Sequence, residues 1–271
     1  MRHLLLSLFF VISAMTAQAQ DARLSSLDTG DAARGWEAVG RLDIAGRGFC
    51  TGALIAPDLV LTAAHCLFDR ATGDRIDPTG IRFLAGLRNG RALAYRDVRR
   101  AAIPAGYDFE DRISNASTRD DLALLELTQP IRLPSIVPFE TTGAIGTDVG
   151  VVSYAHDRAE APSLQETCAV LGRSEGVVVM SCDVDFGSSG APVFTLDDGT
   201  PRIVSVVSAK ADMDGRRVAL GTSLMEPLAE LQAQFASGQG LFLTPPPEGM
   251  RIVASGERNE TGAHFVQPPQ P

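Results

Sequence analysis

Leu59-Val-Leu-Thr-Ala-Ala-His-Cys66 joins a short apolar run to a histidine and a cysteine. Aliphatic and β-branched residues in its first half favour a buried strand. Small alanines on one side and Cys66 on the other place the imidazole of His65 at the end of that strand. A lone histidine is more often structural than catalytic, so the role of His65 depends on which other reactive side chains the sequence contains.

A second cysteine lies 16 residues upstream, in Gly48-Phe-Cys-Thr-Gly52. A Cys50–Cys66 disulfide would tie the strand before His65 to its neighbour. Closing a loop of this size stabilises a fold by about 3 kcal/mol in the chain-entropy treatment.

Short apolar runs separated by Gly, Pro, Asp and Asn continue from Trp36 to about Leu224. This pattern predicts an all-β sandwich or barrel, and the absence of long amphipathic helices between the runs disfavours alternating strand–helix units. One helix is predicted from Glu226 to about Phe235, with apolar residues on one face. The runs that carry the strand prediction are residues 52–56, 59–62, 81–84, 122–127, 176–180 and 203–207.

The first 19 residues have the three parts of a secretory signal peptide. A basic tip precedes an apolar run from Leu4 to about Ala14, and Ala17-Gln-Ala19 supplies the small residues of a cleavage site. The apolar run has about 11 residues, whereas a membrane-spanning helix needs about 20. We therefore expect a secreted or periplasmic protein with no membrane association after signal removal.

Two further segments are predicted to lie outside the folded part. Residues 20–35 are polar and without periodicity, which indicates a flexible leader or pro-segment. Residues 238–271 are rich in proline and indicate an extended tail.

The composition excludes some classes of function. The chain has 24 Lys+Arg against 33 Asp+Glu, a formal net charge of −9, so it lacks the basic surface that nucleic-acid binding requires. At 45% hydrophobic and 21% charged residues it can build a core. His156 and His264 have no cysteine or carboxylate cluster at ligand spacing, so we expect no metal and no cofactor.

Two other segments complete a possible reaction centre. In Asp120-Asp-Leu-Ala-Leu-Leu125 the strand would carry Asp121 inward, where its carboxylate could accept a hydrogen bond from an imidazole. In Asp185-Phe-Gly-Ser-Ser-Gly-Ala-Pro-Val-Phe194 the glycines permit a tight turn that exposes a serine hydroxyl and points backbone N–H groups into one hollow. Each segment alone would be an ordinary turn, but the three together are far more specific.

With these strings the sequence resembles the trypsin-like (chymotrypsin-fold) serine peptidases, most closely the bacterial V8-like, glutamyl-endopeptidase-related branch. The strings occur in that family's chain order, His then Asp then Ser, within residues 36–224. The resemblance implies two antiparallel six-stranded β-barrels with a cleft between them. It places the first barrel at residues 36–135, and the second barrel with the terminal helix at residues 136–237.

The resemblance also implies the role of each residue. Ser189 would be the nucleophile, His65 the general base and then acid, and Asp121 the group that orients the imidazole. The backbone N–H groups of Gly187 and Ser189 would form the oxyanion hole. Ser188 competes with Ser189 for the first role, and the family's Gly-x-Ser-Gly-x-Pro spacing selects Ser189.

Activation and specificity depart from the digestive members of the family. Ser188 stands where those enzymes carry an aspartate that pairs with a new N-terminus, so that salt bridge cannot form, although cleavage near Arg34-Gly35 could still remove a zymogen leader. Asp183 lies six residues before Ser189, at the place of the pocket-floor aspartate of basic-specific members. Its alternative interpretation is a surface or turn residue.

The predicted strand at residues 203–209 would line the specificity pocket. Val207 occupies the position where the glutamyl-specific branch has a histidine, which disfavours a preference for glutamate. Ser208 is expected to present the backbone that pairs with the peptide, with a register shifted to Ser205 as the alternative.

The four cysteines allow three pairings. Cys50–Cys66 with Cys168–Cys182 is favoured, because each bridge would brace one wall of the cleft. We therefore predict a secreted, monomeric serine endopeptidase that hydrolyses polypeptides through an acyl-enzyme. The alternative is a non-catalytic binding protein with the same fold. A third possibility, an esterase of the α/β-hydrolase fold, is disfavoured. The His, Asp, Ser order of this chain differs from the order in that fold, and no Gly-x-Ser-x-Gly elbow follows a predicted strand.

Overall fold

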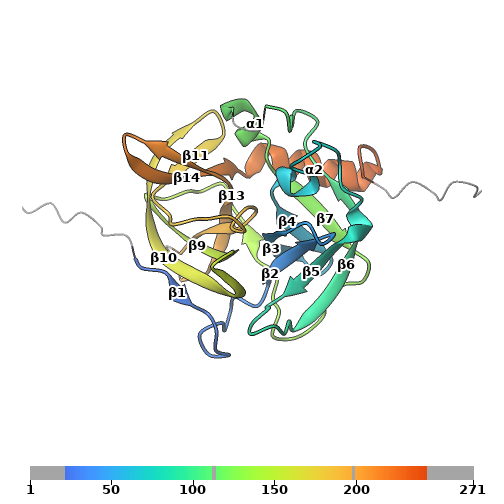
Figure 1. Cartoon of the computed structure of the whole chain (residues 1–271), viewed down its shortest axis with the longest axis horizontal. Coiled ribbons are helices and arrows are strands. Elements are labelled where there is room, and N and C mark those ends of the chain that lie inside the picture. Colours follow the sequence, from blue (N-terminus) through green and yellow to red (C-terminus); the bar gives the residue numbers. More distant parts are fainter. Residues whose placement is uncertain (1–21, 112–113, 197–198, 243–271) are drawn as a thin grey trace, which may run out of the picture.

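Two β-barrels stand side by side in the computed structural model, which describes residues 22–111, 114–196 and 199–242 (Figure 1). Each barrel is a closed ring of six antiparallel strands, and a helix follows the last strand. The all-β prediction with two six-stranded barrels and a C-terminal helix is confirmed.

The first barrel closes in the order β2-β3-β4-β7-β6-β5, with β5 returning to β2. Leu42, Leu61, Phe83 and Leu124 come from four of its strands and are all fully buried, because alternate residues of each strand point to the barrel interior. Its strands are β2 Val39–Ile44, β3 Phe49–Ala56, β4 Leu59–Thr62, β5 Ile81–Ala85, β6 Ala94–Ala102 and β7 Ala123–Leu127.

The second barrel closes in the order β9-β10-β11-β14-β13-β12, with β12 returning to β9. Two short strands lie outside the ring: β1 (Ser25–Ser26) pairs with β10, and β8 (Glu140–Thr141) runs parallel to β13. The barrel strands are β9 Asp148–Ala155, β10 Arg158–Ser174, β11 Val177–Met180, β12 Pro192–Thr195, β13 Arg202–Met213 and β14 Arg216–Ser223.

Buried side chains join the two barrels. The rings of Trp36 and Phe139 meet the ring of Phe194, with centroids 5.0 and 4.8 Å from it. The hydroxyl of Tyr154, on β9, donates to the carbonyl of Leu87, 2.9 Å away, and burial raises the pKa of Tyr154. These ring contacts and this hydrogen bond therefore connect the two barrels through a shared core.

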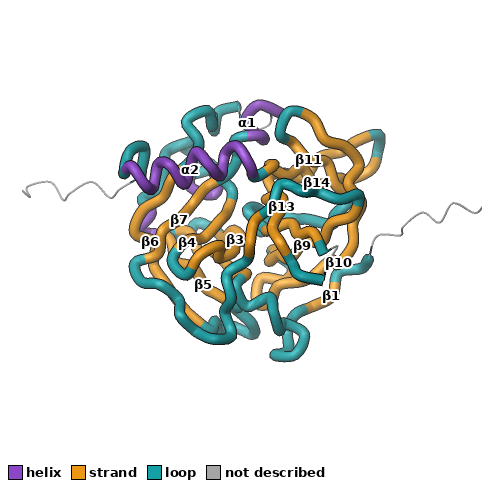
Figure 2. The backbone as a smooth tube through the Cα atoms, turned by 180° about the vertical axis from the view of Figure 1, so that it is seen from behind, coloured by secondary structure: helices purple, strands orange, loops and turns teal. Residues whose placement is uncertain are grey.

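Helix α2 (Met225–Ser237) follows the second barrel but lies against the first (Figures 1 and 2). Its Glu230 carboxylate accepts the N–H of Ala105 at 2.7 Å, and its Gln234 side chain donates to the carbonyl of Ile103 at 3.1 Å. The sequence predicted this helix from Glu226 to Phe235, within one or two residues of its bounds. The remaining helices are short: α1 Asn115–Arg119, η1 Ala64–Leu67 and η2 Pro78–Gly80.

The segment from residue 22 to residue 35 is docked, which differs from the flexible leader expected from its composition. Leu27 is 3% exposed and donates its N–H to the carbonyl of Pro162 at 2.9 Å. From the first barrel, the Asn89 side chain donates to the carbonyl of Asp28 at 3.1 Å. A single leucine and a two-residue strand leave no periodic signal in a polar sequence, so the composition could not indicate this packing.

The predicted signal peptide and residues 243–271 of the predicted tail lie outside the described residues. Phe242 exchanges backbone hydrogen bonds with Ala101, so the described start of the tail lies on the first barrel. No helix among the described residues is long and apolar enough to cross a membrane.

Candidate active site

His65 lies on the short helix η1, which begins two residues after β4 ends. The buried alanines Ala63 and Ala64 let this turn pack tightly under the cleft. A disulfide joins Cys66 on the same turn to Cys50 on β3. The turn that carries His65 is therefore covalently linked to β3, and the His65 side chain is 11% exposed.

Asp121 lies between α1 and β7, with its side chain 5% exposed and facing His65. One carboxylate oxygen accepts the backbone N–H of His65 at 2.9 Å, and the other lies 2.7 Å from the imidazole Nδ1. Because an ionised carboxylate only accepts, Nδ1 carries the hydrogen and Nε2 is left as the basic nitrogen.

Ser208 completes the surroundings of that carboxylate. Its hydroxyl donates to Asp121 Oδ2 at 2.5 Å, and the side chain is buried on β13. Asp121 thus accepts three hydrogen bonds, which compensate the burial of its charge. The sequence placed Ser208 beside the substrate but not on Asp121, since a partner on another barrel leaves no trace in spacing.

Ser189 is half-buried and lines a cavity of about 410 Å³ together with His65, Asp121, Val207 and Ser208. The turn that carries it has positive φ angles at Gly187 (100°) and at Gly190 (78°), a region that glycine adopts without a Cβ penalty.

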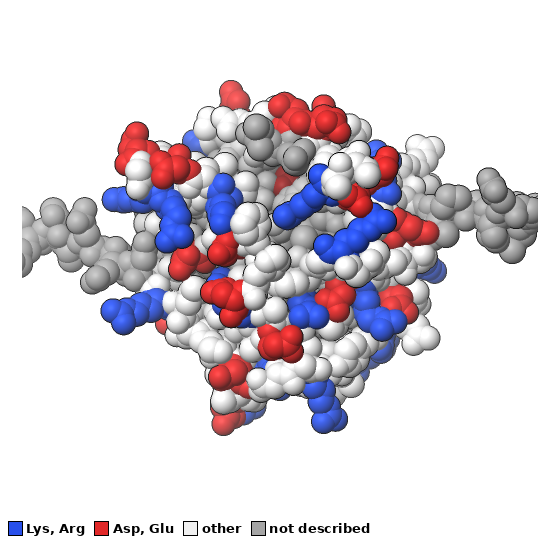
Figure 3. Space-filling view, in the orientation of Figure 1, with Lys and Arg blue, Asp and Glu red and all other residues white. Residues whose placement is uncertain are grey.

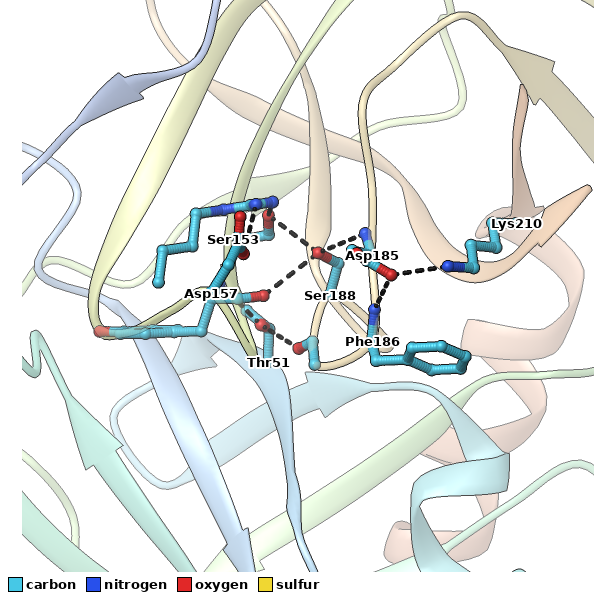
Figure 4. Close-up of polar contacts among 10 residues, drawn as sticks. Thr51, Ser153, Asp157, Asp185, Phe186, Ser188 and Lys210 are labelled. Carbon is cyan, nitrogen blue, oxygen red and sulfur yellow. Dashed lines mark hydrogen bonds and ion pairs between the residues drawn. The ribbon is translucent and has the colours of Figure 1, made fainter. Parts of the chain in front are cut away.

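Ser188 points the opposite way from this cavity, into the second barrel. It is fully buried, and its hydroxyl lies 3.2 Å from that of Ser153 and 3.1 Å from the carbonyl of Tyr154 (Figure 4). Of the two adjacent serines, only Ser189 is therefore placed with His65 on the cavity.

Asp183, the candidate pocket-floor carboxylate, is not among the residues that line this cavity. It is exposed and lines a separate hollow with Asp212 and Arg217, while its N–H donates to the side chain of Gln165 at 2.8 Å. Asp183 therefore lies outside this cavity, which favours its alternative interpretation as a surface residue. Six residues of spacing do not fix a side chain's direction when the intervening loop differs.

We expect Asp183→Asn to leave primary specificity unchanged, because the carboxylate lies outside the cavity. The kcat/KM ratio for Arg-containing over Ala-containing peptides should stay within about two-fold of the starting protein, as for an ordinary surface substitution. A cleavage profile on matched peptides measures this ratio. A decrease of ten-fold or more in kcat/KM for the Arg-containing peptides would show that Asp183 contributes to substrate binding.

Besides Asp121, the charged side chains that line the cavity are Arg70, Asp185 and Lys210, the only lysine of the chain. Lys210 Nζ lies 2.6 Å from Asp185 Oδ1 and 4.2 Å from the ring centre of Phe186. The hydrogen bond from Lys210 holds the pKa of the Asp185 carboxyl below its usual range. The apolar part of the lining is formed by Phe109, Val184, Phe186, Val207 and Ala209.

A second cavity of about 500 Å³ adjoins the first and shares His65, Arg70 and Phe186 with it. The disulfide between Cys50 and Cys66 lies on its wall.

The cluster of Cys50, His65 and Cys66 is the one group among the described residues with the proximity of a metal site. Its sulfurs are bonded to each other, so they offer no thiolate ligand. The second disulfide, Cys168–Cys182, joins β10 to the segment that leads to the serine turn.

Positive and negative side chains are interspersed over the face shown in Figure 3. This face has no continuous basic stripe of the kind that follows a phosphate backbone.

The comparisons with known proteins point to one family. A trypsin-like peptidase domain matches residues 50–201. The chain is 28% identical over 152 residues to a glutamyl endopeptidase of Bacillus licheniformis (54% of this chain, 45% of that protein). It is 29% identical over 188 residues to a trypsin-like protease of Streptomyces glaucescens (59% and 64%).

A solved structure of a Glu endopeptidase in complex with MPD superposes with a TM-score of 0.65 at 18% identity, covering 82% of this chain and 99% of that one. This structure supports the fold. The chain spans less than two thirds of the length of each of the two curated relatives.

Proposed function

The chain belongs to the trypsin-like peptidase family, and on this premise we propose that it is a serine endopeptidase in which Ser189, His65 and Asp121 carry the chemistry. The observation that carries the proposal is the placement of Asp121, whose carboxylate holds the His65 imidazole while His65 and Ser189 line one cavity. The proposed substrates are polypeptides, and the signal sequence supports secretion.

The first step is attack by the Ser189 hydroxyl on the carbonyl carbon of the scissile bond. Nε2 of His65 removes the hydroxyl proton, since Nδ1 is already bonded to Asp121. The buried carboxylate stabilises the imidazolium that forms. His65 then returns the proton to the leaving amine, which departs and leaves an acyl-enzyme. Water, deprotonated by the same imidazole, hydrolyses the ester.

The tetrahedral intermediate needs donors for its negative oxygen. Within the described part of the chain, the N–H groups of Gly187 and Ser189 donate to no protein acceptor. They are therefore free to bind an oxyanion, and each such donor is worth about 3–4 kcal/mol in the transition state. This supports hydrolysis over the alternative of a non-catalytic binding protein.

The proposal predicts that the folded chain reacts with a fluorophosphonate probe and hydrolyses an unfolded protein such as reduced, alkylated casein. One probe should be incorporated per chain, because an activated serine attacks phosphorus as it attacks a carbonyl carbon. Intact-mass spectrometry and release of soluble peptides measure the two results. Properly folded, disulfide-bonded protein that neither labels nor cleaves would support the binding-protein alternative.

A further inference from the structure

The backbone of the serine turn is hydrogen-bonded at every carbonyl from Phe186 to Ser189. The four donors are the N–H of His156 to Phe186 (2.9 Å), the hydroxyl of Thr51 to Gly187 (2.9 Å), the N–H of Ala191 to Ser188 (2.9 Å) and the N–H of Thr51 to Ser189 (2.8 Å). With each carbonyl already bonded to a protein donor, none is free to turn into the cavity and occupy the place of an oxyanion.

These bonds also direct the N–H groups that are left. A peptide unit is planar, and its carbonyl and the following N–H point in opposite directions. Because the Phe186 carbonyl is fixed on the N–H of His156, the Gly187 N–H is turned away from His156. The Ser188 carbonyl, fixed on Ala191, constrains the Ser189 N–H in the same way.

Two of the four bonds come from one residue, Thr51 on β3 of the first barrel. Thr51 is fully buried, and its hydroxyl donates to the Gly187 carbonyl while accepting the N–H of Tyr154 on β9 at 3.1 Å. Its own carbonyl accepts the hydroxyl of Thr62 at 2.8 Å. In Figure 4 the Thr51 hydroxyl is bonded to the serine turn, and the Ser188 hydroxyl, within that turn, accepts the N–H of Asp185.

We propose that Thr51 is a positioning residue that holds the serine turn in the conformation able to bind an oxyanion. This inference rests on the proposed function. Without the hydroxyl, the Gly187 carbonyl and the Tyr154 N–H lose a buried partner. An unpaired buried carbonyl is costly, and rotation of its peptide toward the cavity relieves that cost while moving the adjacent donors.

The test uses Thr51→Val, which keeps the side-chain shape and removes the hydroxyl, beside Thr51→Ser, which retains it. Thr51→Val should lower kcat for a peptide substrate by about 10- to 100-fold, with KM within about two-fold. This loss is smaller than the roughly 10²- to 10³-fold loss on removal of an oxyanion donor, because the donors are displaced and not deleted. Affinity for a peptide aldehyde, whose adduct places an oxygen in the hole, should fall by the same factor as kcat. Thr51→Ser should recover most of both losses.

Ser205→Ala is the matched control for loss of a buried hydroxyl. Ser205 is fully buried on β13 and, unlike Ser208, is not among the residues that line the cavity of His65 and Ser189. Its hydroxyl donates to the carbonyl of Thr222 at 2.9 Å, and not to the serine turn. It should lower the melting temperature without changing kcat or aldehyde affinity, measured well below that temperature.

Two results would overturn the inference alone: wild-type kcat and aldehyde affinity in Thr51→Val, or losses in Ser205→Ala that equal those in Thr51→Val. A folded wild-type chain without hydrolysis or labelling would instead overturn the proposed function, and this inference with it.

Discussion

Ser189→Ala should reduce kcat for peptide hydrolysis by about 10⁶-fold, the loss seen when the nucleophile of a serine peptidase is removed. Ser189 provides the only hydroxyl of the serine turn that shares a cavity with His65. An alanine leaves the glycine-bounded turn and its carbonyl bonds in place, so the protein should still fold and bind substrate. Initial rates on a fluorogenic peptide, with fluorophosphonate labelling followed by mass spectrometry, measure the effect.

The matched control is Ser188→Ala, one residue earlier. Its hydroxyl is buried against Ser153 and Tyr154, so its loss should cost about 1 kcal/mol of stability, the net value of an ordinary hydrogen bond. Labelling should persist in this variant. If Ser189→Ala were labelled and Ser188→Ala were not, the nucleophile would be Ser188.

The sequence predicted the all-β class because the responsible signals are local, whereas the division into two six-stranded barrels came from the resemblance to the trypsin-like peptidases. Apolar runs of strand length, separated by turn residues, mark β3, β4, β5 and β7, and the apolar face of residues 226–235 marks α2. The strand bounds expected from the sequence agree approximately with those of the structure, because Gly, Pro and Asp favour turns and so end strands. The docking of Leu27 onto β10 was missed, because it depends on a partner 135 residues away at Pro162.

The residues of the candidate site also divide into those with a local sequence signal and those that depend on distant parts of the chain. His65, Asp121 and Ser189 stand in short strings whose order and spacing are specific, and the structure brings these three side chains to one cavity. Asp183 instead lines a separate hollow, because its direction depends on the course of a loop that spacing alone does not describe.

Thr51 and Ser208 were missed as supports of the site, although both residues are polar and fully or nearly buried. Each acts across the interface between the barrels, on Gly187 and on Asp121. The one local signal for Thr51 was a hydroxyl directly after Cys50 in a strand that is otherwise apolar.

Asp121→Asn should lower kcat by about 10⁴-fold while leaving the fold and KM nearly unchanged. The two carboxylate oxygens of Asp121 face three donors: the N–H and Nδ1–H of His65 and the hydroxyl of Ser208. An asparagine offers one oxygen and one NH₂ group. If the asparagine oxygen faced Nδ1, its NH₂ group would face the backbone N–H of His65. Two buried donors would then meet without an acceptor, which is unfavourable.

The opposite orientation is therefore favoured in Asp121→Asn, with the NH₂ facing Nδ1 and the Ser208 hydroxyl turning to accept. His65 must then carry its hydrogen on Nε2, the tautomer that cannot take a proton from Ser189. Asp120→Asn is the control: the neighbouring carboxylate pairs with Arg119 at 3.2 Å and is absent from the cavity lining, so its rate should stay within about two-fold. Equal losses in the two variants would show that net charge, and not the imidazole tautomer, sets the rate.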